Sequence, residues 1–323
     1  MEHRKEVWTV GICTLLLALI LRAGLIPAGD HSALSFMMYL QTGRWVRYPE
    51  AAAPQVTPTQ PQTHPLEGEK PGGISLTEGD LNVVEVNNLT DYDLQEAALL
   101  TAPLAWNLTE GGPKVLILHT HTTESYTRQP GEIYEEDSDY RTFNAAYNMI
   151  SIGKELAQIL EQGGISVLHD QTYHDYPSFS GSYADARQTV ESYLEAYPSI
   201  QVVIDLHRDA LDFEKDPQLT TMATVEGQKS AQLMLVAGTD TNASHPNWKE
   251  NLAVCMKLTA VLEQMHPGIT RPIQLRPQRF NLDLTAGSLL VEVGANGNTH
   301  QEALVAVRVL GEALVAMSEG VNL

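Results

Sequence analysis

Short apolar runs alternate with longer segments in which apolar residues recur every three or four positions, from residue 114 to residue 318. The short runs predict strands, which we expect at 115–118, 165–168, 202–206, 222–225, 233–237 and 288–293. The longer segments predict amphipathic helices, which we expect around 149–159, 186–197, 248–265 and 299–318. This alternation predicts an α/β fold, with a mostly parallel or mixed sheet covered by helices on both faces.

Two of the predicted helices carry boundary signals. The first is followed by Gly163 and Gly164, and glycine readily adopts the conformation that ends a helix. The last opens with Thr299 and Glu302, whose spacing is that of a capping box, in which each side chain accepts a hydrogen bond from the other residue's backbone. We therefore expect these helices to end and begin close to those residues.

The extreme N-terminus has a membrane-like pattern. Residues 7–21 contain no charged side chain and follow the basic residues His3, Arg4 and Lys5. This predicts an anchor within residues 1–28, with its basic end in the cytoplasm and the rest of the chain outside. A cleaved signal peptide is the alternative, because its apolar core is equally short.

The region between the anchor and the regular pattern is poor in apolar periodicity. Residues 48–75 are rich in proline, glutamine, threonine and glycine, and such a composition cannot bury a core. We expect an extended tether outside the membrane at 29–75. A short arm at 76–112 then precedes the main domain at 113–323.

Composition restricts the function. The 323 residues carry a formal net charge of −20, which argues against nucleic-acid binding because phosphate contacts need clustered lysine and arginine. The acidic balance does not identify a partner by itself. The two cysteines, Cys13 and Cys255, lie too far apart in different segments to form a disulfide framework or a thiolate zinc site. A metal in this chain would therefore be held by nitrogen and oxygen.

Side chains suited to metal chemistry follow three of the predicted strands. The first strand leads into His121 and Glu124, and the third leads into His207. The last strand contains Glu292. Because sites in open α/β sheets form at the carboxyl ends of strands, we expect these side chains to converge. Two imidazoles and one carboxylate suit a catalytic zinc with an open position, and Glu292 would then act as general base.

Several assignments stay open at this stage. His119 and His121 lie two positions apart and would face the same side of a strand, so either could be the ligand. We favour His121 because it completes a His-x-x-Glu spacing, which leaves His119 to face the substrate or to support a ligand. The opposing interpretation is that all these groups are hydrogen-bonded structural residues. Against it, a carboxylate such as Glu292 is costly to bury without a partner.

The sequence also offers candidate substrate contacts. Arg208 follows His207 directly and either pairs with Asp209 to steady the loop or binds a substrate carboxylate through its planar guanidinium. Arg279 and Asn281 lie in the loop before the last strand. We expect both to line a groove.

Four separated segments together resemble one known family. LILHTHTTESY at 116–126, VVIDLHRDA at 202–210, LMLVAGTDTNASHPNWKENL at 233–252 and RFNLDLTAGSLLVEVGANGNTHQEA at 279–303 resemble, in this order, the catalytic domain of stage II sporulation protein P. The resemblance covers about residues 80–318. The predicted anchor and tether are consistent with it.

The resemblance implies a zinc-dependent N-acetylmuramoyl-L-alanine amidase that also cuts peptide cross-links of peptidoglycan during forespore engulfment. It implies a single-pass protein of the mother-cell membrane, with its catalytic domain facing the septal wall. The implied partners are stage II sporulation protein D, a lytic transglycosylase, and the membrane protein stage II sporulation protein M. Because an uncontrolled wall hydrolase would lyse its own cell, we expect a partner to regulate the activity.

Carried onto this chain, the resemblance implies Zn²⁺ held by His121, Glu124 and His207, with Glu292 assisting. In the wider zinc amidase group the carboxylate ligand lies further along, on a helix, so Glu155 or Glu161 competes with Glu124. Two other functions stay open: a zinc carboxypeptidase or endopeptidase that acts only on stem peptides, and a non-catalytic scaffold that binds the wall.

Overall fold

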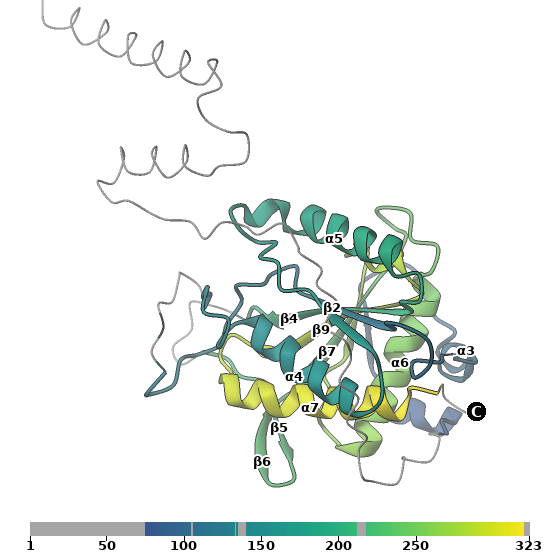
Figure 1. Ribbon diagram of the computed structural model, residues 1–323. Coiled ribbons are helices and arrows are strands. Elements are labelled where there is room, and N and C mark those ends of the chain that lie inside the picture. The colour runs from purple at the N-terminus through teal and green to yellow at the C-terminus, as the bar shows by residue number, and fades with distance from the viewer. Residues whose placement is uncertain (1–74, 105, 133, 135–139, 212–217, 320–323) are drawn as a thin grey trace, which may run out of the picture. The chain divides into compact units, whose positions relative to one another are not determined.

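The apolar runs of the sequence become the strands of one seven-stranded sheet in the computed structural model, which describes residues 75–104, 106–132, 134, 140–211 and 218–319 (Figure 1). All of these residues belong to one compact unit. The strands stand in the following order across the sheet: β1 (Val86–Asn88), β8 (Ile273–Arg276), β7 (Leu233–Gly238), β9 (Gly287–Ala295), β4 (Val202–Asp209), β2 (Val115–Leu118) and β3 (Val167–His169).

The sheet consists of two parallel blocks. Strands β1, β8 and β7 run in one direction, and β9, β4, β2 and β3 run in the other. The blocks meet where β7 pairs with β9 in antiparallel fashion. The prediction of a mixed sheet is therefore confirmed. As a consequence, the carboxyl ends of β2, β4 and β9 lie at the same edge of the sheet.

Helices cover both faces of this sheet, as predicted. Helix α5 lies on one face, and α4, α6 and α7 lie on the other (Figure 1). The helices are α3 (Glu96–Thr101), α4 (Met149–Gln162), α5 (Ser182–Ala196), α6 (Trp248–Met265) and α7 (His300–Ala316). Short 3-10 turns occur at η1 (Glu78–Val83), η2 (Phe179–Gly181) and η3 (Leu282–Leu284).

The helix boundaries follow the signals in the sequence. At the start of α7, the Thr299 side chain accepts a hydrogen bond from the Glu302 amide at 3.1 Å, and the Glu302 carboxylate accepts one from the Thr299 amide at 3.0 Å. The predicted capping box is thus confirmed. Asn148 caps the start of α4, because its side chain accepts a hydrogen bond from the Ile150 amide at 3.0 Å. Gly164 follows the end of the helix with a φ of +85°.

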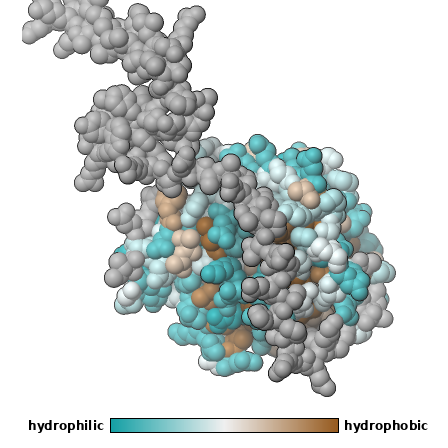
Figure 2. Space-filling model, viewed as in Figure 1, coloured by the Kyte–Doolittle hydropathy of each residue, from teal (hydrophilic) through white to brown (hydrophobic). Residues whose placement is uncertain are grey.

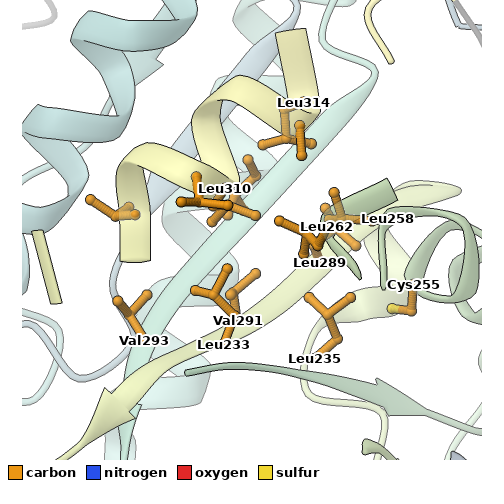
Figure 3. Close-up of a cluster of buried hydrophobic side chains, with 14 of the residues drawn as sticks. Leu233, Leu235, Cys255, Leu258, Leu262, Leu289, Val291, Val293, Leu310 and Leu314 are labelled. Atoms are coloured by element: carbon orange, nitrogen blue, oxygen red, sulfur yellow. The ribbon is translucent and has the colours of Figure 1, made fainter. Parts of the chain in front are cut away.

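The main core lies between the sheet and the helices α4, α6 and α7. Leu233 and Leu235 of β7 and Val291 of β9 project toward α6 and α7 (Figure 3). Burying each such side chain contributes about 1.5–3 kcal/mol. A second cluster beneath α5 contains the alternate strand residues, among them Leu116 and Val203. Because the inner strands are covered on both faces, they are continuous apolar runs in the sequence.

The structure shifts the bounds of several predicted strands and places another outside the main sheet. Strand β4 continues to Asp209, past the predicted end at residue 206, because it keeps pairing with β9 beyond the apolar run. Strand β3 begins two residues later than predicted. The run at 222–225 is a strand, β5 (Met222–Val225), but it pairs with β6 (Gln228–Ala231) in a separate hairpin outside the main sheet.

The segment at 76–112 contributes directly to the main fold. Its strand β1 pairs with the edge of β8, and Leu76, Leu100 and Leu108 are fully buried in the main core. The predicted anchor and almost all of the predicted tether lie outside the described residues. None of the helices in the described part of the chain is both long and apolar enough to cross a membrane.

The described surface is mainly hydrophilic in the view of Figure 2, including the part over α5, and hydrophobic residues are scattered within it. Exposed aromatic side chains nevertheless gather near the carboxyl ends of the strands. Phe143, Tyr176 and Phe179 are 46%, 37% and 55% exposed, and Phe143 packs perpendicular to Tyr176 at 5.1 Å between ring centroids.

Candidate active site

Two neighbouring strands position the first pair of candidate side chains. His207 of β4 stands directly opposite Glu292 of β9 in the parallel register. Leu206 and Val291, their neighbours along each strand, face the main core. Because side chains alternate along a strand, His207 and Glu292 project from the opposite face of the sheet, the face that α5 covers. Asp205 lies two residues before His207 and shares that face.

The turn after β2 brings the other two candidates to the same place. His121 lies in this turn, and its ring centroid is 5.1 Å from that of His207, with the rings nearly perpendicular. The Glu124 Oε2 atom is 3.7 Å from His207 Nδ1. The turn is tied to β4 because the Thr120 amide and hydroxyl donate hydrogen bonds to Asp205 at 2.8 and 2.6 Å. The structure thus brings His121, Glu124, His207 and Glu292 together.

His119 does not share the face of His121, contrary to the expectation for residues two apart on a strand. Strand β2 ends at Leu118, and the chain turns before His121. The His119 Nε2 atom lies 2.9 Å from His169 Nε2, and a Cβ added at Gly153 of α4 would meet both rings. His119 therefore lies under α4, and the role of facing a substrate on the α5 side is not open to it.

The helical carboxylates that competed with Glu124 lie elsewhere. Glu155 of α4 forms an ion pair with Arg308 of α7, with 2.6 Å between Oε1 and Nε. Glu161 is exposed in the last turn of α4. Both belong to the helix layer on the face opposite α5. Among these three carboxylates, Glu124 is the one beside the candidate histidines.

Arg208 supports the loop that carries Glu124. The side chain is buried, and its Nε and Nη2 atoms donate to the backbone carbonyls of Ser125 and Tyr140 at 2.9 and 3.0 Å. The Arg208 amide also donates to Glu124 Oε2 at 3.2 Å. Asp209 pairs instead with Arg271 at 2.8 Å. Of the two roles that the sequence allowed for Arg208, the structure favours the one that steadies the loop. The carboxylate that Arg208 contacts is Glu124 and not Asp209.

The loop before β9 is connected to the site by its contact with α5. The Asn281 side-chain amide donates to the Tyr183 carbonyl at 2.7 Å, and both Phe280 and Asn281 have a φ above +50°. Arg279 is partly exposed and lies 3.5 Å from Asp283. Of the two groove candidates, Asn281 holds α5 in place, and Arg279 pairs with Asp283 of η3.

Three contributors to the site were not predicted. Asp205 contacts His207 Nε2 at 3.0 Å, and its position two residues before His207 is the signal that could have found it. The ring of Phe179 stacks on that of His121 at 4.5 Å. The ring of Tyr183 is perpendicular to His121 at 5.6 Å. No local pattern in the sequence marks the two aromatic residues.

Burial and charge shift the protonation of these groups strongly. Burial lowers the pKa of His207, but the carboxylates of Asp205, Glu124 and Glu292 outweigh it and raise that pKa to about 10. For Asp205, burial is outweighed by His207 and by the Thr120 hydrogen bonds, so its pKa falls to about 2. Burial lowers the pKa of His121 to about 4.

The two glutamates respond in opposite directions. Burial raises the pKa of Glu292 to about 8, and the negative charges of Glu124 and Asp209 add to this effect. Burial acts in the same direction on Glu124, but the positive Arg208 and His207 outweigh it and hold the pKa of Glu124 below its ordinary value. One carboxyl group is thus favoured in its charged form and a neighbouring one in its neutral form, an arrangement typical of catalytic sites.

The candidate ligands are of the residue types that bind zinc, but their present positions are less close to those of a zinc site. No three His, Cys, Asp or Glu side chains among the described residues form a ready-made metal site. His121, Glu124 and His207 nevertheless supply the two nitrogens and one oxygen that a catalytic zinc prefers. Asp205 lies 3.0 Å from Nε2 of His207, and Glu124 lies 3.7 Å from Nδ1 of the same ring. A buried Glu292 Oε2 without a hydrogen-bond partner among the described residues adjoins them.

A cavity of about 600 Å³ lies at the other end of β4 and β9. It is lined by apolar and polar residues of the segment 99–106 and of α6, together with Gln201 and Gly287. None of the candidate site residues borders it.

These features define an α/β protein with a site of imidazole and carboxylate groups on its central strands. The family model of stage II sporulation protein P matches residues 42–315, and the chain belongs to this family. The resemblance of the four sequence segments is thereby confirmed.

The chain is 29% identical over 252 residues to stage II sporulation protein P of Bacillus subtilis (strain 168). The match covers 74% of this chain and 58% of the relative. The chain therefore matches less than two thirds of the length of that relative.

Solved structures give more distant matches. The CwlD amidase from Clostridioides difficile, in complex with the GerS lipoprotein, is 11% identical with a TM-score of 0.38 over 64% of this chain and 97% of that one. An N-acetylmuramoyl-L-alanine amidase from Clostridium difficile 630 is 17% identical with a TM-score of 0.35, over 64% of this chain and 94% of that one.

Proposed function

We propose that this protein is a hydrolase of the bacterial cell wall that cleaves the amide bond between N-acetylmuramic acid and L-alanine, and also peptide cross-links. The observation that carries the proposal is the convergence of His121, Glu124 and His207 beside the buried carboxyl of Glu292. Family membership supports a role in sporulation. We assign the activity to remodelling of the septal wall during engulfment.

The proposal includes Zn²⁺ held by His121, Glu124 and His207. When bound, this ion would polarise the attacking water and the amide carbonyl. Asp205 would fix the His207 ring through Nε2 and so direct Nδ1 toward the ion, as carboxylates commonly do for metal-binding histidines. Arg208 would hold Glu124 in place through the loop contacts described above.

Glu292 would move the proton in this reaction. It accepts a proton from the attacking water as the oxygen–carbon bond forms, and it delivers this proton to the amide nitrogen as the carbon–nitrogen bond breaks. The products are a carboxylic acid and a free amine. A pKa of about 8 suits this task, because such a group exchanges protons readily near neutral pH.

The setting proposed for this activity follows the family. The chain would be anchored in the mother-cell membrane by its N-terminal segment, with the hydrolase domain outside the cytoplasm against the septum. It would act there with stage II sporulation proteins D and M. Control by such a partner would protect the cell from its own hydrolase.

Digestion of purified peptidoglycan by the full chain tests the proposal. Mass spectrometry of the products should show lactyl-sugar ends free of peptide, and elemental analysis should find one zinc per chain. New ends only within the stem peptides would favour the carboxypeptidase or endopeptidase alternative. A protein with neither new ends nor zinc would match the wall-binding scaffold and contradict the proposal.

Substitution of the proposed base sharpens this test. Glu292→Gln keeps the shape of the side chain but cannot accept the proton, so we expect the hydrolysis rate to fall about 10²–10⁴-fold with zinc content retained. Glu155→Gln is the matched control, since it makes the same chemical change at a carboxylate of α4 that pairs with Arg308 away from the site. Equal activity of the two variants would remove Glu292 from the mechanism.

A further inference from the structure

Tyr183 occupies the centre of the site without any role in the scheme above. It is the second residue of α5. Its ring stands perpendicular to His121 at 5.6 Å, nearly parallel to His207 at 6.4 Å, and beside Phe280 at 5.9 Å. Side chains from three separate segments of the chain, among them both candidate zinc-binding histidines, therefore surround this ring.

The hydroxyl of Tyr183 differs from those of Tyr126 and Tyr193 in its hydrogen bonding. Tyr126 donates to the Val293 carbonyl at 2.8 Å, and Tyr193 donates to Asp170 at 3.2 Å. Buried tyrosine hydroxyls usually find such partners. Within the described part of the chain, no group accepts a hydrogen bond from the Tyr183 hydroxyl, although the ring is largely enclosed.

The charges around this hydroxyl keep its proton in place. Burial, followed by the negative charges of Asp205, Glu292 and Glu124, raises the pKa of Tyr183. The phenol therefore lies near the acidic groups of the site as a hydrogen-bond donor.

The backbone around Tyr183 is fixed before any substrate arrives. The Asn281 amide holds the Tyr183 carbonyl at 2.7 Å. The preceding residue, Ser182, bonds to the Phe179 carbonyl at 2.9 Å and lies 3.3 Å from His121 Nδ1. A donor that needs no rearrangement during the reaction stabilises developing charge most effectively.

We propose that Tyr183 is a further catalytic residue, whose hydroxyl donates a hydrogen bond to the carbonyl oxygen of the amide under hydrolysis. The inference rests on the proposed function. As water adds to the carbonyl carbon, negative charge develops on the carbonyl oxygen, and the phenol stabilises it while keeping its own proton. The proton lost by the water travels through Glu292 to the departing nitrogen, so the phenol completes the site without entering the proton balance.

Tyr183→Phe is the direct test, because it retains the ring and its packing and removes only the hydroxyl. With soluble glycan–peptide chains as substrate, we expect kcat of the full chain to fall about 10²–10³-fold, the loss typical of one oxyanion donor, while KM stays nearly constant. Zinc content and thermal midpoint should match those of the unsubstituted protein. Tyr173→Phe is the matched control, since its hydroxyl donates to the Phe143 carbonyl at 2.9 Å, and it should leave kcat nearly unchanged.

The possible outcomes separate this inference from the proposed function. An active unsubstituted protein with an equally active Tyr183→Phe variant overturns only the role of Tyr183. A variant that loses zinc or thermal stability along with activity shows a packing role and also overturns it. An unsubstituted protein that holds zinc but leaves peptidoglycan intact overturns the proposed function and this inference together.

Discussion

Two histidine pairs stand on opposite faces of the same sheet with nearly the same geometry. His121 and His207 have ring centroids 5.1 Å apart at 89°, and His119 and His169 have centroids 5.1 Å apart at 86°. Their surroundings differ. The first pair lies beside the carboxylates of the α5 face. The second is closed on itself by the 2.9 Å contact between its Nε2 atoms and is covered by Gly153 of α4.

The difference shows that environment decides what a pair of imidazoles can do. Carboxylates raise the pKa of His207 to about 10 against the effect of burial, whereas burial alone lowers the pKa of His169 to about 4. Burial also lowers the pKa of His119, so both rings of this pair are favoured in their neutral form. The pair beneath α5 lies instead among the carboxylates of Asp205, Glu124 and Glu292, and this distinguishes a site from packing.

The largest expected difference between the pairs is in catalysis. His207→Gln removes a proposed zinc ligand, so we expect the hydrolysis rate to fall by at least about 10³-fold and zinc to be lost. His169→Gln changes the other pair and should leave the rate nearly unchanged. Rates on purified peptidoglycan and zinc per chain measure both. A comparable fall in the two variants would mean that the pairs are not functionally distinct.

A smaller effect, on stability, is expected from adding a side chain to the helix that packs over His119 and His169. In Gly153→Ala, the added Cβ would lie 2.5 Å from His169 Nε2 and 2.7 Å from the His119 ring. We expect the free energy of unfolding to fall by about 1–3 kcal/mol, although alanine is the better helix former by about 1 kcal/mol. Urea unfolding measures this change.

Gly181→Ala is the control for that substitution. Its added Cβ has no neighbour closer than Asp185 Oδ2 at 3.7 Å, so its stability should change by less than about 0.5 kcal/mol. If Gly153→Ala stabilised the protein, the His119 and His169 side chains would have to move aside at little cost, and the pair would not be a packed structural unit.

The smallest expected effect is a pH dependence of stability from His169. Its pKa is about 4 in the folded protein and about 6.5 when unfolded. Between these values the unfolded chain binds the extra proton, so stability falls as the pH is lowered. From pH 6.5 to 5.5 the native protein should lose about 1 kcal/mol more than His169→Gln does. Burial is the largest cause of the lowered pKa of His119 and is present in both proteins, so identical slopes would contradict the neutral assignment of His169.

The sequence predicted most of the layers of this fold because burial of one face makes apolar residues recur at the spacing of a helix or a strand. Helix α6 spans Trp248–Met265, as its apolar spacing indicated. Strand β8 escaped prediction because it is only four residues long and lies between two prolines, where its alternation Ile-Gln-Leu-Arg is too brief to stand out. The extension of β4 to Asp209 depends on pairing with β9, and the residues of one strand do not indicate how far it pairs with another.

The site was predictable to the extent that it depends on strand ends. Side chains at the carboxyl ends of β2, β4 and β9 had to converge, and they do. The opposite facing of His119 and His121 could not be predicted, because it depends on Asp205 capturing the backbone of Thr120 from another strand. The place of Tyr183 depends on the path of α5 across the sheet, which no local spacing encodes.

The way the arm joins the sheet limits how the protein can be shortened for biochemical work. Lys257 of α6 is fully buried, and its ammonium donates to the carbonyls of Leu99 and Leu100 at the end of α3. A fragment beginning at residue 113 would leave that buried ammonium without hydrogen-bond acceptors. It would also expose the unpaired edge of β8, and exposed strand edges promote self-association. Fragments that begin before Leu76 keep both contacts and are the ones in which the chemistry of the site can be measured.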